Sequence, residues 1–96
     1  MRVRFLRPAE SEYLEALRYY ATQSADLAGA FLDDLDHAVN LLSEYAEIGA
    51  PYDVDKRRVL LRRFHYSLIY QVELNEVVVV AVMHQSQQPR SWRQQS

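Results

Sequence analysis

The sequence predicts an α+β domain in which a helical hairpin packs on a small, mainly antiparallel sheet, in the order β-α-α-β-β-β. Three features lead to this prediction: a short alternating segment near the N-terminus, two consecutive segments with helical periodicity, and three strand-like segments in the second half. A helical hairpin has a joint apolar face that a sheet can cover. Because 96 residues suffice for one core of modest size, we expect residues 1–96 to form a single domain.

The first segment, residues 2–6, alternates polar and apolar side chains, which is the two-residue period of a strand with one buried face. Pro8 follows, and its fixed φ suits the start of a helix. Acidic residues come next, where they suit the positive end of a helix. Apolar side chains then recur at helical spacing, at Tyr13, Leu14, Leu17 and Tyr20. We expect the first helix over about residues 9–22.

The second helix is the longest in the chain, and Ser24 or Asp26 is its expected N-cap. Its apolar side recurs at helical spacing and consists of Leu27, Phe31, Leu35, Ala38 and Leu42. Its polar side consists of Asp33, Asp34, Asp36, His37 and Asn40. Gly49 and Pro51 then end the helical region.

Three strands are expected in the second half, over residues 57–64, 66–73 and 77–83, with a hairpin turn at residues 74–76. The last strand is apolar on both faces, which indicates a central position. The helices would cover one of its faces. The C-terminal tail or a partner protein would cover the other.

The composition is that of a soluble globular chain, with 49% hydrophobic and 25% charged residues. The longest apolar run, residues 77–83, is too short to cross a bilayer, and the N-terminus lacks an apolar core of signal-peptide length. We therefore expect a cytoplasmic protein without a membrane segment. The absence of cysteine excludes disulfides and thiolate metal sites.

The net charge of −2 combines an acidic half with a basic half. Residues 1–55 carry eleven acids and four bases, whereas residues 56–96 carry seven bases and two acids. Such a split can focus a positive field on one face, so contact with nucleic acid is one interpretation. Solvated helices followed by an ordinary basic strand edge are the other.

His84 is the first candidate functional residue, because it lies where an apolar strand becomes polar. The ordinary pKa of histidine suits general acid or base catalysis. A single histidine without a visible partner is, however, more often a hydrogen-bonded structural residue.

The second candidate is the basic run over residues 56–63. In a strand, Arg58 and Arg62 would point to one face and Arg57 and Arg63 to the other, so that each face presents a pair of guanidinium groups to a phosphate or carboxylate. Arginines could also stabilise the phosphorane in metal-free RNA cleavage. We favour the simpler interpretation, in which these side chains pair with the acids of the long helix or keep a sheet edge soluble.

No motif of a conventional enzyme is visible. The serines lack a nucleophile elbow, the two glycines do not form a phosphate loop, no carboxylate pair stands out, and the three histidines lack the spacing of a zinc site. We therefore expect neither a metal nor a cofactor.

The whole chain nevertheless resembles the RelE/ParE superfamily of toxins from type II toxin-antitoxin systems, often called plasmid stabilisation proteins. The resemblance covers residues 3–93. Its carriers are Ala9 and Glu10 before the segment 15–20 (EALRYY), the aromatic-rich segment 62–70 (RRFHYSLIY), and the segment 80–84 (VAVMH) followed by Pro89 and Trp92. The Tyr19-Tyr20 pair and the arrangement of His84, Pro89 and Trp92 look more like the ParE branch than the RelE branch.

The resemblance implies a toxin that binds DNA gyrase without catalysis and that a cognate antitoxin neutralises. The alternative it implies is a RelE-like, metal-independent endoribonuclease that cuts mRNA on the ribosome, with Arg58, Arg62 and His84 as candidate catalytic residues. A non-toxic interaction domain of the same fold is the third possibility. The segment 85–88 (QSQQ) departs from the usual basic residues after His84 and weighs against the nuclease, as does the acidic net charge. The candidate partner-binding residues are Arg62, Arg63, His65, His84, Arg90 and Trp92.

The only tryptophan, Trp92, lies in an otherwise polar tail. Burying this large apolar side chain against the body of the domain would stabilise the fold by up to a few kcal/mol. We therefore predict that Trp92 docks back and shields the outer face of the last strand.

Overall fold

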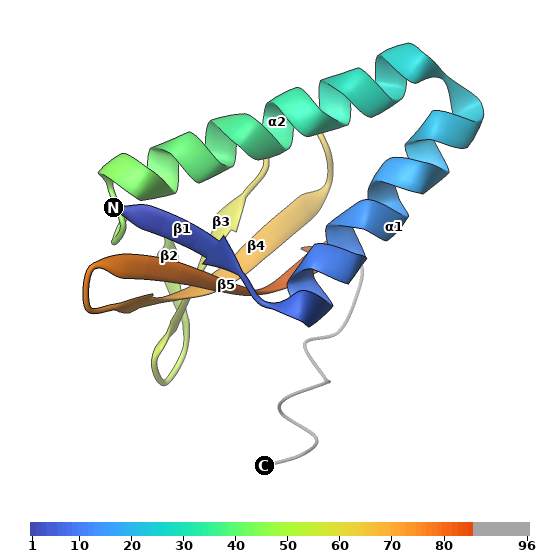
Figure 1. The fold of residues 1–96 in the computed structure, drawn as a ribbon. Coiled ribbons are helices and arrows are strands. Elements are labelled where there is room, and N and C mark those ends of the chain that lie inside the picture. Colours follow the sequence, from blue (N-terminus) through green and yellow to red (C-terminus); the bar gives the residue numbers. More distant parts are fainter. Residues whose placement is uncertain (86–96) are drawn as a thin grey trace.

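Two helices cover one face of a five-stranded sheet in the computed structural model, which describes residues 1–85 (Figure 1). The elements are β1 (Arg2–Phe5), α1 (Arg7–Gln23), α2 (Ala25–Glu44), β2 (Ala50–Asp53), β3 (Lys56–Leu60), β4 (Tyr66–Glu73) and β5 (Glu76–His84). The strand order is β1-β5-β4-β3-β2, with β1 parallel to β5 and every other neighbouring pair antiparallel. This confirms the predicted fold class.

The helices form where the periodicity predicts them. α1 starts at Arg7, about two residues earlier than expected, because the first turn of a helix tolerates Pro8, whose missing N–H has no intrahelical partner there. Ser24 is the N-cap of α2, as predicted, and its Oγ accepts the backbone N–H of Leu27 at 3.2 Å. No helix within residues 1–85 is long and apolar enough to cross a membrane.

The sheet contains one strand that the sequence pattern does not predict. β2 follows Gly49 and includes Pro51, two residues that usually interrupt regular structure. Within residues 1–85 it is an edge strand that pairs with β3 alone. An edge strand tolerates a proline where the missing N–H would not have bonded to a neighbouring strand. Arg57 ties down the preceding loop by donating to the carbonyl oxygens of Glu47 and Gly49, at 3.1 and 2.8 Å.

β3 is shorter than predicted, and this corrects one part of the sequence argument. The strand ends at Leu60 rather than at residue 64. The backbone N–H groups of Arg62, Arg63 and Phe64 bind the carboxylate of Asp34 instead of a neighbouring strand. Arg62 and Arg63 therefore lie in a loop, and the expectation that strand alternation pairs them with Arg58 and Arg57 is wrong.

The core lies between the helices and the sheet. Its largest fully buried members include Phe31 and Leu42 from α2, Leu68 and Tyr70 from β4, and Val79 from β5. The last strand was predicted to be central; β5 is an inner strand, between β1 and β4, and the central strand of the five is β4. The other face of β5 is buried as well: Val78 and Ala81 are 2% and 3% exposed.

Candidate partner-binding surfaces

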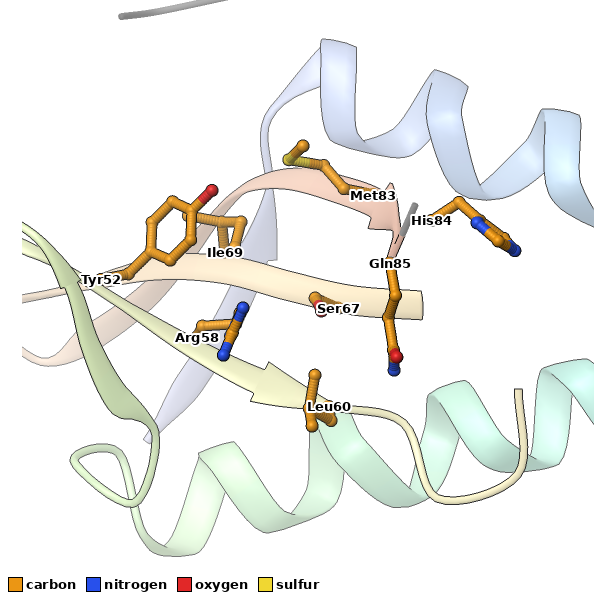
Figure 2. A pocket seen from close by; sticks show the side chains of 8 residues that line it. All are labelled: Tyr52, Arg58, Leu60, Ser67, Ile69, Met83, His84 and Gln85. Atoms are coloured by element: carbon orange, nitrogen blue, oxygen red, sulfur yellow. The ribbon is translucent and has the colours of Figure 1, made fainter. Parts of the chain in front are cut away.

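Two hollows flank the end of β5, and His84 lines both. The first, which we call the outer hollow, has a volume of about 200 Å³ and opens on the face of the sheet away from the helices (Figure 2). It is lined by Tyr52, Arg58, Leu60, Ser67, Ile69, Met83, His84 and Gln85. The second, the helix-side groove, has a volume of about 210 Å³ and lies between α1 and β5. It is lined by Glu12, Glu15, Ala16, Tyr19, Tyr66, Val82 and His84.

A β-bulge decides to which face His84 points. Ile69 pairs with Ala81 and Tyr70 pairs with Val79, so that Val80 is an extra residue in β5. Before the bulge, Val77 and Val79 face the core, and after it Val82 does. Since side chains alternate along a strand, the bulge places His84 on the helix side, opposite Tyr66.

The His84 ring packs against Tyr66 on that side. The two rings meet edge to face, with centroids 5.2 Å apart and an interplanar angle of 87°. Tyr66 in turn contacts Tyr20 and Phe31, which belong to an aromatic cluster under the helical hairpin. Burial, followed by the influence of Tyr20, raises the pKa of Tyr66 to about 12, so its hydroxyl is neutral at physiological pH.

The helix-side groove contains a carboxylate that binds the sheet edge. β1 pairs with β5 only as far as Val79, so within residues 1–85 no strand lies beside the following part of β5 on this edge. Glu12 of α1 fills part of this position, because its Oε1 accepts the backbone N–H of Val82 at 2.8 Å. The residue is exposed overall, but burial of its carboxylate raises the pKa of Glu12, against the lowering effect of the Val82 hydrogen bond.

The outer hollow has a guanidinium group beside a floor made of one polar and one apolar side chain. Arg58 is exposed and its guanidinium carbon lies 5.8 Å from the ring centroid of Tyr52, which is a cation–π geometry. Ser67 and Ile69 of β4 form a buried floor, 5% and 1% exposed. In Figure 2 the ring of His84 points away from Arg58. The two residues share the rim of one hollow but direct their side chains to different faces.

The loop between β3 and β4 carries three further candidates, Arg62, Arg63 and His65, and all three are exposed. The buried carboxylate of Asp34 fixes the backbone of the two arginines. The Nη1 atom of Arg62 lies 3.4 Å from Nε2 of His37 on α2. Arg90 and Trp92, and with them the predicted docking of the tryptophan, lie outside the described residues.

The described part of the chain contains no group of three or more potential metal ligands. The polar side chains that line the hollows are Tyr52, Arg58, Ser67, His84 and Gln85 in the outer hollow and Glu12, Glu15, Tyr19, Tyr66 and His84 in the helix-side groove.

Comparison with known proteins shows the family and the fold. The sequence profile of the family described as "ParE toxin of type II toxin-antitoxin system, parDE" matches residues 3–89. The chain belongs to the ParE toxin family. Among solved structures, a chain from the "Chromosomal ParDE TA system from P. aeruginosa" is similar with a TM-score of 0.75 and 19% sequence identity, over 88% of this chain and 95% of that chain. At this identity the likeness shows a shared fold. No curated protein gives a significant sequence match.

Two residues that shape this ParE-family site were not predicted from the sequence. Asp34 was expected on the polar side of α2, but it is 4% exposed. A signal was present: Asp34 lies three residues after Phe31 and four before Ala38, on the buried side of the helix. Glu12 showed no such signal, because its partner Val82 is 70 residues away in the sequence.

Proposed function

We propose that this ParE-family chain is a toxin that acts in the cytoplasm by binding DNA gyrase, without chemistry of its own, and that a cognate antitoxin neutralises it. Membership of the family supports the toxin role. The proposal that the toxin does not catalyse a reaction rests on one observation. The side chains of His84 and Arg58 lie on opposite faces of the sheet.

Metal-free cleavage of RNA requires a proton donor and a cationic group around one phosphate, within hydrogen-bond reach of about 3 Å. The ring of His84 packs on Tyr66 on the helix side. Arg58 lies opposite Ile69 on the outer face. Arg62 is directed toward His37. The three nuclease candidates thus have different surroundings, which supports a binding role over catalysis.

Induced expression in a bacterial host tests the proposal. We expect DNA synthesis to stop and the SOS response to rise while amino-acid incorporation continues, because a gyrase-binding toxin acts on DNA topology. Arrest of translation with cut mRNA would contradict the gyrase target and favour the ribosome-dependent endoribonuclease. Normal growth at a verified level of folded protein would favour a non-toxic interaction domain.

For the antitoxin, we propose a small protein encoded beside this gene whose C-terminal segment folds over the helical hairpin and the outer sheet face. Exposed apolar side chains on the hairpin support this: Tyr19 and Leu32 are 59% and 37% exposed. Large apolar groups on a surface favour partner binding. Co-purification should give a complex that survives dilution. A chain that is stable alone and indifferent to the neighbouring product would contradict the proposal.

A further inference from the structure

Arg58 is a cation without an anion in the described part of the chain. Within residues 1–85 the ion pairs join Arg4 to Glu76 and Lys56 to Asp55, and Arg58 takes part in neither. Its described contact is the ring of Tyr52. A guanidinium beside an aromatic ring is well suited to bind a carboxylate. The ring holds the planar guanidinium in place and leaves its N–H groups available as donors.

The rest of the outer hollow combines polar and apolar side chains. Ser67 and Ile69 form its floor, and the apolar part of its sides is Met83 and Leu60, with Leu60 49% exposed. The volume of about 200 Å³ is smaller than the roughly 300–1,000 Å³ of ordinary small-molecule sites. The hollow therefore has room for one or two side chains of a protein rather than for a cofactor.

Charge selects among the possible occupants. The guanidinium of Arg58 favours an occupant with an acidic group. Nucleic acid normally needs several cations along its backbone, whereas this hollow supplies one arginine. An acidic side chain next to an apolar one, in an extended segment of a partner protein, matches both parts of the hollow.

We infer that the outer hollow binds an acidic side chain and its apolar neighbour from an extended segment of the antitoxin, with Arg58 holding the carboxylate. The inference rests on the proposed function in that an antitoxin supplies the segment. Arg58 is then a determinant of antitoxin affinity, and the outer face of the sheet is part of the neutralised surface.

The test uses the full chain with Arg58→Met, which keeps an unbranched apolar side chain and removes the charge. Arg7→Met, at the exposed first residue of α1 and twelve residues before Tyr19, is the matched control. Dissociation constants with the product of the neighbouring gene should rise at least tenfold for Arg58→Met and stay within twofold for Arg7→Met. Equal affinity of Arg58→Met and wild type would overturn the inference and leave the proposed function standing. If neither wild type nor either variant binds that product, both the inference and the proposed function are overturned.

A second measurement does not depend on a variant of the chain. An acetylated, amidated Ser-Leu-Glu-Leu-Ser peptide is titrated into the ¹⁵N-labelled wild-type chain, and a peptide with Gln in place of Glu is the control. We expect the amide signals of Ser67 and Ile69 to shift, with at least fivefold weaker binding of the control. Equal binding of both peptides would overturn the inference.

The other possible occupants of the hollow give different results. A single-stranded RNA hexamer that shifts the same signals at lower concentration than the peptide would identify a nucleic-acid site and overturn the inference. A Trp92→Ala chain that binds the peptide more than tenfold more tightly would show that the chain's own C-terminal residues occupy the hollow, and would overturn it as well.

Discussion

The carboxylate of Asp34, in the middle of α2, accepts the backbone N–H of Arg63 at 2.8 Å. The same carboxylate accepts the N–H of Phe64 at 2.9 Å and that of Arg62 at 3.2 Å. One buried side chain thus satisfies three consecutive donors and ties the loop between β3 and β4 to the helical layer. These three hydrogen bonds therefore fix the position of the exposed residues Arg62 and Arg63.

Asp34→Asn should lower the free energy of unfolding by about 3 kcal/mol, because the amide has one acceptor oxygen and turns an NH₂ group toward backbone donors. Urea unfolding measures the loss. Asp33→Asn, at the exposed neighbouring position, is the control and should change stability by less than about 0.5 kcal/mol. Similar losses in both variants would show that the three hydrogen bonds do not determine stability.

The two glycines should respond to alanine in opposite directions. At Gly49, a Cβ would lie 2.7 Å from the Tyr70 hydroxyl oxygen and 2.8 Å from the carbonyl oxygen of Arg58. The second contact could be relieved only by moving the backbone of β3. Gly49→Ala should therefore cost about 2 kcal/mol or more. At Gly29, inside α2, nothing lies within 4 Å, so Gly29→Ala should stabilise by about 0.5–1 kcal/mol. Thermal unfolding of the pair checks both signs, and a stabilising Gly49→Ala would contradict the described packing.

Glu12 should make stability depend on pH with a definite sign. Its folded-state pKa is raised, so the folded protein binds the proton more tightly than the unfolded chain does. The contribution of Glu12 to stability is then present below the ordinary value of 4.5 and is lost as the pH rises through the folded-state pKa.

Glu12→Gln keeps an acceptor for the Val82 N–H and removes the charge. We expect this variant to be at least as stable as wild type at pH 7, with the difference shrinking as the pH falls below 4.5. Glu12→Ala should lose about 1 kcal/mol, because the N–H keeps no protein partner. Unfolding curves from pH 4 to pH 7 test this. A wild-type advantage over Glu12→Gln that grows with pH would contradict the sign.

His84→Gln should cost about 1 kcal/mol of stability, from its lost packing on Tyr66 and one altered hydrogen bond, and should leave toxicity unchanged at equal amounts of folded protein. His37→Gln, at an exposed position on α2, is the matched control. Growth arrest at matched protein levels is the readout. Folded His84→Gln protein without toxicity, beside a toxic His37→Gln, would support a catalytic histidine.

The elements that local sequence determines were predictable. Residues such as Ser24, Phe31 and Leu42 set the helices through capping and periodicity within a few positions. Which side chains of β5 face the helices was not predictable in this way, because the bulge at Val80 depends on how β5 pairs with β4. The Asp34 contacts join residues 28 to 30 positions apart, and the Glu12 contact spans 70. Such long-range bonds leave no periodic trace in a single sequence.

The central claim is that this ParE-family chain acts by binding DNA gyrase rather than by cleaving RNA. The most direct measurement is a gyrase supercoiling assay with the purified chain, with and without the neighbouring gene product, run beside a cleavage assay on mRNA in translating ribosomes. The account predicts that the chain inhibits supercoiling, that the neighbouring product restores it, that His84→Gln inhibits equally well, and that the mRNA stays intact. Unaffected supercoiling together with mRNA cleavage that His84→Gln abolishes would contradict it.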